Sequence, residues 1–516
     1  MIFKSPSPAV NIPNISWPEY FLQRMAPLND QIALIDTESD RQISYAELKQ
    51  HIQSVALTLQ QKGYKKGDVF AIYAPNLLEY VISIQAILLL GGIVTTANPL
   101  YTACELEHQL NHSKAICLFT TSDLLAKVNP ILNNAAVQEV FVFDDSHSFG
   151  SLLLANCDKV FRPAIIDPDK DIALLPYSSG TTGLPKGVML SHRNLVAHNV
   201  QFEAQKDTTY PDNGDHLIAL LPFFHIYGIT VIMNLGLCNG STLLITNGFK
   251  PKQFLGLIQQ YQVQKAYLVP PVILFLAESP LVDDYDMSSM QYIMSGAAPL
   301  GEEQVLELRE RISCTVCQGY GLTETSPVTH KEPDLLNTKL GSAGVLLPNT
   351  EAMIIDTETG KPLGFNQTGE LLLRGPQVMM GYLDNPEATA STLDVNGWLH
   401  TGDIARVDQD GFFYIVDRLK ELIKCNSYQV APAELEALLL THPAVTDAAV
   451  VPKPDKKSGE VPKAFVVVKQ DISTDELISW AARQVASYKR IKEIEFIDQI
   501  PKSPSGKILR RVLRNR

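Results

Sequence analysis

A loop rich in glycine, hydroxyl and lysine side chains follows an apolar, strand-like run. The run is Ile172–Pro176, and the loop reads Tyr-Ser-Ser-Gly-Thr-Thr-Gly-Leu-Pro-Lys-Gly from residue 177 to residue 187. Its glycines let backbone N–H groups turn toward one point, while four hydroxyls and one ammonium add donors and positive charge. This combination predicts a cradle for a polyphosphate. The candidate contacts are Ser178, Ser179, Gly180, Thr181, Thr182, Gly183 and Lys186.

The loop is not a Walker A motif. After Gly180 and four further residues comes Pro185, where that motif has Gly followed by Lys and Ser or Thr. The alternative is a flexible linker rich in serine, glycine and threonine. A linker gives no reason for Pro-Lys-Gly at one end and a buried strand at the other, so the phosphate loop is the stronger interpretation.

Six further segments, in a fixed order along the chain, complete a family resemblance. They are Pro222–Gly228, Gly296–Pro299, Gln318–Thr325, Gly397–Asp403, Asp417–Lys424 and Pro501–Lys507. Together with the loop they resemble the adenylate-forming superfamily of acyl-CoA synthetases, nonribosomal-peptide adenylation domains and firefly-type luciferases. The residues of these motifs are most similar to those of 4-coumarate–CoA ligase-like and medium-chain acyl-CoA ligases. The similarity spans essentially the whole chain.

The resemblance implies an acid–CoA ligase that uses ATP, Mg²⁺ and CoA. A carboxylic acid first attacks the α-phosphate of ATP, giving an acyl-adenylate and pyrophosphate. Because two anions react, the site must supply positive charge where the transition state is negative. By resemblance Lys507 touches both reacting groups, Glu324 binds Mg²⁺, a metal that prefers hard oxygen ligands, and Thr323 contacts the α-phosphate. An ordinary surface lysine is the alternative for Lys507.

The same resemblance implies a nucleotide site. Asp403 would accept hydrogen bonds from the ribose hydroxyls, Arg418 would contact the same sugar, and Tyr320 would form one side of the adenine slot. Simple turn chemistry is the alternative for Asp403, and a buried tyrosine with a satisfied hydroxyl is the alternative for Tyr320. The remaining nucleotide-binding candidates are Gly296, Ala297, Ala298, Gln318, Gly319, Gly321 and Gln429.

The second half-reaction, transfer of the acyl group to CoA, is expected to use Lys424. In the resembled family the C-terminal domain pivots at a hinge, here Lys420, and presents its two lysines in turn. The family usually has Lys-x-x-Gly-x-Gln after the hinge, whereas this chain has Ser427 in place of the glycine. Glycine permits close approach of pantetheine to the backbone, so we expect slow CoA transfer.

The resemblance also gives an acyl pocket lined by His225, Tyr227, Val231, Pro327 and Val328, with His225 as a catalytic gate. A satisfied core histidine is the alternative for His225. Hydroxycinnamate ligases tend to carry a polar residue where Val231 stands. The pocket should therefore be apolar and favour an aryl (cinnamate-like) acid without hydroxyl groups or a medium-chain fatty acid.

The elements that must position these residues alternate between helix and strand. Ser44-Tyr-Ala-Glu47 is a capping box that opens an amphipathic helix, and Asn76 with Glu79 starts a second helix that ends at Gly91-Gly92. Such alternation predicts mainly parallel sheets covered by helices. Short strands separated by turn residues follow from about residue 350, and a compact unit restarts after Asp417–Lys420.

The predicted fold class is α/β. Residues 1–417 form a large N-terminal domain, with doubly wound α/β subdomains at 1–165 and 171–349 and a β-barrel-like subdomain at 350–417. Residues 418–420 form the hinge, and residues 421–516 form a mobile α+β domain.

The uncharged run Leu217–Leu237 is long enough to span a bilayer. Its Pro222, His225, Gly228 and Asn234 fit better with a buried strand, a turn and a buried helix.

Composition bounds the class of protein. The net charge of −13 disfavours a general nucleic-acid or anionic-membrane binder, although Lys489–Arg516 carries nine basic and three acidic residues. Seven sparse cysteines do not suggest a disulfide framework, and Cys314-Thr-Val-Cys317 is interpreted as core packing in preference to a zinc or redox site. The start of the chain lacks a secretory pattern, so the expected compartment is the cytoplasm.

Two rival functions remain open at this stage. An adenylating enzyme of the same kind transfers its acyl group to the phosphopantetheine of an external carrier protein. A binding or regulatory protein keeps the fold without turnover, and the presence of Lys424, Lys507 and Glu324 weighs against it.

Overall fold

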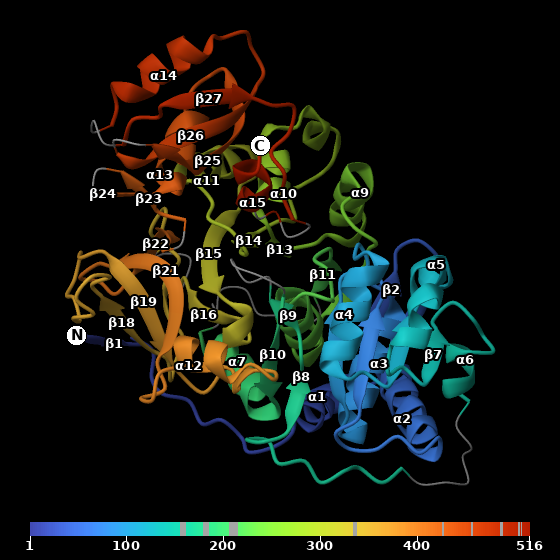
Figure 1. The fold of residues 1–516 in the computed structure, drawn as a ribbon. Helices are drawn as coiled ribbons and strands as arrows, with labels where there is room; N and C mark the ends of the chain where they lie inside the picture. The colour runs from blue at the N-terminus through green and yellow to red at the C-terminus, as the bar shows by residue number, and fades with distance from the viewer. Residues whose placement is uncertain are drawn as a thin grey trace.

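The computed structural model describes residues 1–516 except 155–160, 179–184, 206–214, 334–337, 420, 426–427, 456–457, 486–488, 504–505 and 507. The side chains of Lys424, Tyr428, Gln429 and Arg511 also lie outside the described part. A large α/β part, a β-rich sheet and a small C-terminal domain make up the molecule (Figure 1). This arrangement confirms the α/β fold class with a separate C-terminal unit.

The first sheet has eight strands and carries the base of the predicted phosphate loop. Its order is β20-β10-β8-β5-β4-β6-β7, with β9 paired to β10. The strands from β8 to β7 pair in parallel, whereas β10 pairs antiparallel with both β8 and β20. Their bounds are β4 Val69–Tyr73, β5 Ile93–Ala97, β6 Cys117–Thr120, β7 Glu139–Val142, β8 Ile172–Leu174, β9 Tyr177–Ser178, β10 Lys186–Ser191 and β20 Gly381–Tyr382.

Two further sheets complete the α/β part. One has the order β11-β12-β2-β3, with bounds β11 His216–Ala219, β12 Thr242–Ile245, β2 Ile32–Asp36 and β3 Gln42–Ser44. The other runs β13 Lys265–Leu268, β14 Tyr292–Ser295, β15 Thr315–Gly321, β16 Val328–Lys331 and β17 Val345–Leu346. The eight-stranded and four-stranded sheets each draw strands from both sides of residue 165.

Helices cover these sheets. They are α1 Trp17–Met25, α2 Tyr45–Gln61, α3 Leu78–Leu90, α4 Ala103–Ser113, α5 Leu125–Val128, α6 Phe149–Leu152, α7 His192–Ala204, α8 Gly236–Cys238, α9 Pro251–Tyr261, α10 Pro270–Glu278, α11 Glu302–Arg311 and α12 Pro386–Thr392. Short 3₁₀ turns occur at η1 Ala26–Leu28, η2 Ser122–Leu124, η3 Asn129–Asn134, η5 Pro280–Asp284 and η6 Thr323–Thr325.

Two predicted helix starts have different outcomes. The capping box at Ser44 is confirmed, because Ser44 and Glu47 exchange their side-chain and backbone hydrogen bonds at the start of α2. The prediction for Asn76 is wrong, since α3 begins after Leu77 without a side-chain cap. Asn76 instead donates to the carbonyls of Ala219 and Leu221 at 2.9 and 3.0 Å, so it joins two segments that lie far apart in sequence.

The apolar run at 217–237 is internal, as predicted. It comprises β11, a turn, the π-helix η4 Gly228–Leu235 and α8, and every residue of η4 is buried. Among the described residues, no helix combines the length and hydropathy needed to cross a membrane. Cys314 and Cys317 are buried as free thiols, which confirms their interpretation as core residues.

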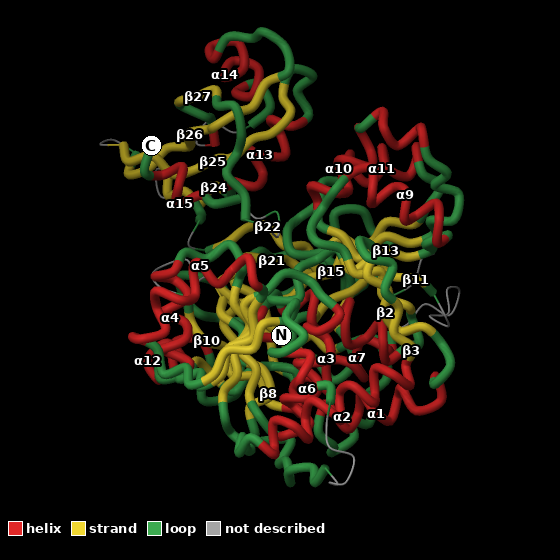
Figure 2. Tube along the Cα trace, turned by 90° about the vertical axis from the view of Figure 1, so that its right-hand side faces the viewer, coloured by secondary structure: helices red, strands yellow, loops and turns green. Residues whose placement is uncertain are grey.

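The β-rich sheet draws its first strand from the N-terminus. Its order is β1-β18-β19-β21-β22, with bounds β1 Ile2–Lys4, β18 Glu351–Ile355, β19 Gly369–Arg374, β21 Leu399–Val407 and β22 Phe413–Arg418. Strands β21 and β22 lie between the α/β part and the C-terminal domain (Figure 2). The end of β22 is therefore the point at which the chain leaves the large part of the molecule.

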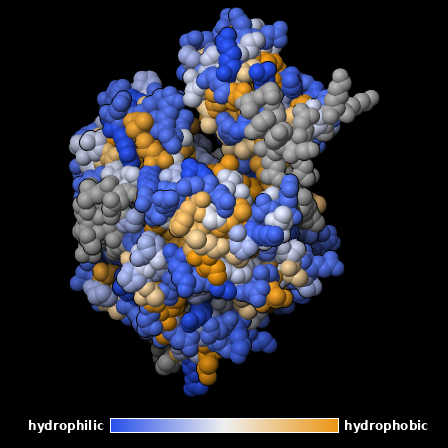
Figure 3. All heavy atoms as spheres, turned by 90° about the vertical axis from the view of Figure 1, so that its left-hand side faces the viewer, coloured by the Kyte–Doolittle hydropathy of each residue, from blue (hydrophilic) through white to orange (hydrophobic). Residues whose placement is uncertain are grey.

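The C-terminal domain has its own core and forms a smaller lobe above the larger one (Figure 3). Its sheet has the order β24-β23-β26-β25, with β27 paired to β26. The bounds are β23 Ile423–Cys425, β24 Tyr428–Val430, β25 Val445–Asp455, β26 Gly459–Val468, β27 Glu493–Phe496, α13 Pro432–Leu440, α14 Thr474–Ala482 and α15 Arg510–Arg514. A self-contained core is what a unit that moves as one body requires.

Candidate active site

The base of the predicted phosphate loop is a short antiparallel hairpin. Tyr177 and Ser178 in β9 pair with Gly187 and Lys186 in β10, so the two ends of the loop lie side by side. The predicted contacts Ser179, Gly180, Thr181, Thr182 and Gly183 lie outside the described residues. Tyr177 is held from the side by His112 of α4, whose Nδ1 lies 2.7 Å from the tyrosine hydroxyl. Helix α4 therefore fixes the start of the loop.

Glu324 faces the base of this loop. Its Oε1 accepts a hydrogen bond of 3.0 Å from the Ser178 hydroxyl and one of 2.9 Å from the Tyr382 hydroxyl. Lys186 Nζ lies 4.6 Å from the centre of the Tyr382 ring. Burial and the Glu324 carboxylate raise the pKa of Tyr382, so its hydroxyl remains a donor. The arrangement places one carboxylate, two hydroxyls and one ammonium at the mouth of the loop.

Tyr382 was missed by the sequence analysis. It lies in the short strand β20, 58 residues beyond Glu324, and pairs with Val188 of β10. Its neighbours in sequence, Gly381 and Leu383, give no spacing pattern that marks a site. Only the pairing of β20 with β10 brings its hydroxyl to Glu324.

Asp403 lies at the junction of β15 with the β-rich sheet. The Tyr320 hydroxyl donates a 2.6 Å hydrogen bond to Asp403 Oδ2, and Arg418 Nε lies 3.2 Å from Oδ1. Asp403 and Arg418 are direct partners across β21 and β22. Asp403 is only 3% exposed, and its backbone N–H bonds to the Thr401 hydroxyl at 3.0 Å. Burial and the adjacent carboxylate raise the pKa of Tyr320, so its hydroxyl stays protonated.

The turn after β14 packs against an aromatic ring. A Cβ added to Gly296 would lie 2.9 Å from the Tyr227 ring, so only glycine permits this contact. Ala297 follows with a positive φ of 70°, and Gln318 Oε1 accepts the backbone N–H of Leu300 at 2.9 Å. The segment Gly296–Leu300 is thereby tied to β15, on which Gln318, Gly319, Tyr320 and Gly321 lie in succession.

The residues predicted to line the acyl pocket lie on η4 and β16 or in the residues just before them. Tyr227, Val231 and Val328 are buried, and the Tyr227 hydroxyl reaches the Met294 carbonyl at 3.5 Å. His225 is half-buried in the turn before η4, where its Nδ1 accepts the Tyr227 N–H at 3.4 Å. A Cβ at Gly321 would lie 1.9 Å from the Pro327 carbonyl oxygen, so β15 and Pro327 approach closely. These side chains are apolar apart from His225 and the tyrosine hydroxyl.

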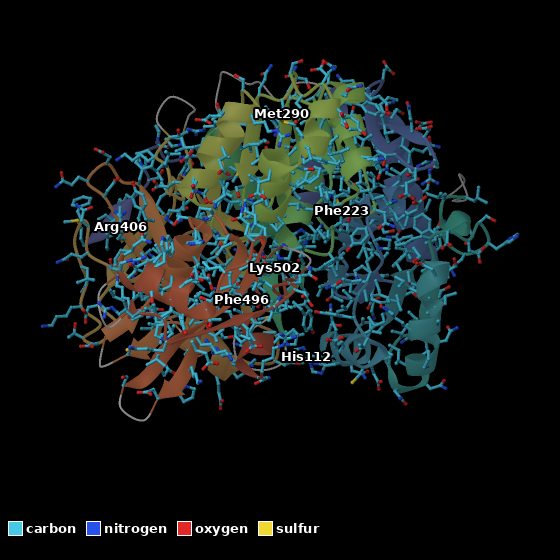
Figure 4. The ribbon with its side chains drawn as sticks, turned by 90° about the horizontal axis from the view of Figure 1, so that it is seen from above. His112, Phe223, Met290, Arg406, Phe496 and Lys502 are labelled. Carbon is cyan, nitrogen blue, oxygen red and sulfur yellow. The ribbon has the colours of Figure 1, made fainter. Side chains whose placement is uncertain are left out.

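The predicted residues of the C-terminal domain are only partly described. Lys420, Ser427 and Lys507 lie outside the described residues, as do the side chains of Lys424 and Gln429. The backbones of Lys424 and Gln429 are direct partners across β23 and β24. Lys502 lies at the border between the C-terminal domain and the α/β part (Figure 4). A Cβ on Gly506 would lie 2.8 Å from Pro271 of α10, so this turn touches the large domain.

Comparison with known families agrees with this geometry. Residues 21–383 match the family described as AMP-binding enzyme, and residues 434–507 match the AMP-binding enzyme C-terminal domain. The 4-coumarate–CoA ligase of Pinus taeda is 42% identical, with 100% of this chain and 97% of the relative covered. The 4-coumarate–CoA ligase 1 of Petroselinum crispum gives the same values.

Solved structures share the whole fold. ATP-bound MatB from Rhodopseudomonas palustris has a TM-score of 0.88 at 27% identity and covers 97% of this chain and 99% of its own. The o-succinylbenzoate CoA synthetase MenE from Bacillus subtilis, in complex with its acyl-adenylate intermediate, has a TM-score of 0.84 at 30% identity and covers 97% and 98%. Both family matches and the relatives span the two parts of this chain. It therefore belongs to the adenylate-forming superfamily of AMP-binding enzymes and is an AMP-forming acid–CoA ligase.

Proposed function

We propose that this ligase activates an apolar aryl (cinnamate-like) or medium-chain fatty acid with ATP and transfers the acyl group to CoA. One observation carries the assignment of the nucleotide site. Tyr320 bonds to Asp403, while Glu324, four residues further on, bonds to Ser178 and Tyr382. Four residues of extended chain span at most about 14 Å. One nucleotide can therefore place its ribose at Asp403 and its phosphates at Glu324.

The nucleotide is held mainly by the large domain in this proposal. Asp403 accepts hydrogen bonds from the ribose hydroxyls, and Arg418 supports the same sugar. Adenine lies between Tyr320 and the turn Gly296–Ala298. Thr323 and the loop from Ser178 to Lys186 contact the phosphates. The buried position of Asp403 supports this role, because a carboxylate shielded from water forms stronger hydrogen bonds with a ligand.

Magnesium fits the donor set around Glu324. Mg²⁺ is commonly bound by one or two carboxylates together with substrate phosphates and water. When bound, it neutralises charge on the phosphates. Glu324 is held by two neutral hydroxyl donors, and among the described residues no lysine or arginine forms an ion pair with it. Among the described residues, no group of three or more His, Cys, Asp or Glu side chains is placed to hold a metal ion.

The acid is assigned from the apolar character of the proposed pocket. Tyr227, Val231 and Val328 present carbon surface, with His225 beside them, and an apolar acid gains affinity by leaving water for such surface. Relatives named 4-coumarate–CoA ligase support an aryl acid, and the resemblance to a Mycobacterium tuberculosis fatty acyl CoA synthetase supports a fatty acid. Pyrophosphate release measured across acetate, decanoate, cinnamate and 4-coumarate tests the class. Highest kcat/KM for acetate or 4-coumarate would contradict the proposal.

Two lysines are proposed to act in turn, with rotation at residues 418–420. Lys507 stabilises the adenylation transition state, and Lys424 with Gln429 belongs to the face presented for thioester formation. Lys507→Ala should abolish acid-dependent pyrophosphate exchange and spare thioester formation from supplied acyl-AMP. Lys424→Ala should do the reverse. Loss of the same half-reaction in both variants would refute the alternation.

CoA is favoured over a carrier protein as acceptor, because all of the curated relatives compared above are named as CoA ligases. Faster acyl transfer to a phosphopantetheinylated carrier protein than to CoA would support the alternative instead.

We place the enzyme in the cytoplasm, since the described cysteines are all free, as in a reducing compartment.

A further inference from the structure

Arg510 is a buried guanidinium that joins three parts of the C-terminal domain. Its Nη2 lies 2.8 Å from Glu436 Oε1 and 2.6 Å from Oε2, so it binds that carboxylate through both oxygens. Its Nη1 donates to Glu421 Oε2, and its Nε donates to the Val450 carbonyl at 3.3 Å. The arginine side chain is 14% exposed. Each of the three guanidinium nitrogens therefore bonds to a different segment of the chain.

Such a buried charge cluster is a weak source of stability. Removing an arginine and two carboxylates from water costs free energy that their attraction only partly returns, and apolar residues of the same volume often stabilise a fold more. A planar guanidinium, however, fixes the relative orientation of its partners because its donors point in set directions. The arrangement at Arg510 thus specifies geometry between Glu421, Glu436 and α15.

One end of this cluster lies at the hinge. Glu421 follows residue 420 directly, and its backbone N–H bonds to the Arg418 carbonyl at 2.9 Å. The next residue, Leu422, bonds to the same carbonyl at 3.1 Å. Asp417 Oδ2 accepts the backbone N–H of Ala433 at 3.0 Å, which ties the start of α13 to the same region. The segment after the hinge is therefore attached both to β22 and, through Arg510, to α15.

The other end of the cluster lies at the turn that carries Lys507. Arg510 opens α15, three residues after Lys507. The turn is closed by hydrogen bonds of 2.8 Å from Leu509 N to the Pro501 carbonyl and from Gly506 N to the Ser503 carbonyl. Gly506 lies against Pro271 of the large domain. A single side chain, Arg510, thus connects the segment after the hinge to the helix that follows this turn.

We propose that Arg510 and Glu421 form a positioning pair for adenylation. The pair fixes the Lys507 turn to the residue after the hinge, so that rotation about the hinge carries the turn into the site as a rigid body. This inference rests on the proposed roles of Lys507 and of the hinge. Without the pair, the turn still reaches the cleft but samples a wider range of positions, and small displacements of a reacting group lower the rate of the chemical step.

The test uses Glu421→Gln in the full-length enzyme. This variant keeps the side-chain shape and leaves Arg510 paired with Glu436, so the fold survives. We expect kcat for acid-dependent pyrophosphate exchange to fall about 10- to 100-fold. KM for ATP and thioester formation from supplied acyl-AMP should be unchanged. The matched control is Glu434→Gln, which breaks an exposed ion pair with Lys489 in the same domain and should leave both half-reactions unchanged.

A double variant separates positioning from general loosening. If Glu421 acts through Lys507, then Glu421→Gln should cause no further loss of pyrophosphate exchange in a Lys507→Ala background. Equal losses in both half-reactions, or additive losses in the double variant, would overturn the pair as a positioning device. Full activity of Glu421→Gln would also overturn it. Full pyrophosphate exchange in Lys507→Ala alone would instead refute the proposed function of Lys507, so the two failures are distinguishable.

Discussion

The Tyr320 hydroxyl donates a 2.6 Å hydrogen bond to Asp403, and this bond joins the sheet that contains β15 to the β-rich sheet. Asp403 is in turn paired with Arg418, the last residue of β22 and the first of the proposed hinge. The proposed ribose site is therefore built where two sheets meet and where the C-terminal domain begins. A nucleotide bound there contacts the same carboxylate that connects these parts.

Tyr320→Phe should weaken ATP binding. The substitution keeps the ring and removes the donor to Asp403, which leaves a buried carboxylate oxygen without that partner. We expect KM for ATP to rise about tenfold, which corresponds to ~1.4 kcal/mol. Steady-state kinetics at saturating acid and CoA measure it. Tyr414→Phe removes a hydroxyl that bonds to Asp408 on the same sheet and serves as the control, with unchanged KM. An unchanged KM for ATP in Tyr320→Phe would show that the Tyr320 hydroxyl has no role in ATP binding.

Glu324→Gln should alter the magnesium dependence of adenylation. Glutamine can still accept the hydrogen bonds of Ser178 and Tyr382 but has no charge for a cation. We expect kcat for pyrophosphate exchange to fall on the order of 10²-fold and the half-saturating Mg²⁺ concentration to rise. A magnesium titration at fixed ATP measures both. The exposed Glu310→Gln on α11 is the control. A normal magnesium titration curve in Glu324→Gln would show that the metal is held elsewhere.

Val231→Ser should change the preferred acid. Val231 is fully buried on η4, and serine adds a hydroxyl at a position proposed to face the acyl group. The ratio of kcat/KM for 4-coumarate to that for cinnamate should rise about tenfold, because a paired hydroxyl favours the phenol while an apolar wall does not. Val450→Ser, in the core of the C-terminal domain, controls for loss of stability. A ratio that moves equally in both variants would rule out Val231 as a pocket residue.

Glu332 should make stability depend on pH. Burial raises the pKa of its carboxyl to about 8, although Arg309 opposes the shift. The folded state holds the proton more tightly than the unfolded state does. Protonation of Glu332 therefore stabilises the folded state fully below about pH 4.5, and this stabilisation is lost as the pH rises toward 8. Urea unfolding should thus give a lower free energy at pH 9 than at pH 5. In Glu332→Gln this difference should shrink by up to about 4 kcal/mol. The control variant Glu310→Gln, at an exposed position, should show the same difference in unfolding free energy as the unmodified protein.

Ser427→Gly should speed CoA transfer. Serine stands where the resembled family usually has glycine, and glycine is the residue that permits the closest approach of pantetheine to the backbone. Thioester formation from supplied acyl-AMP should become severalfold faster, while pyrophosphate exchange stays constant. Stopped-flow or quenched assays with CoA as the varied substrate measure this. Equal rates in the two proteins would show that Ser427 does not limit the transfer.

The sequence predicted local features well where a short-range pattern carries them. The capping box at Ser44 follows from hydrogen bonds between near neighbours in the chain, and the internal position of the run 217–237 follows from the residue types within it. The prediction that Asn76 starts a helix was wrong because the side chain bonds to Ala219 and Leu221, which are about 145 residues away in the chain. A cap and a long-range hydrogen bond use the same side-chain atoms, and spacing alone does not distinguish them.

The sequence by itself determined the family, the order of the reactive segments and the types of side chain available for phosphate, ribose and acid. Tertiary structure alone decided which of them meet. Tyr382 reaches Glu324 through the pairing of β20 with β10, and Tyr320 reaches Asp403 across two sheets. Arg510 reaches Glu421 over 89 residues of chain. Such contacts depend on how separate sheets and domains pack, and hydrophobic periodicity along one segment carries no information about that packing.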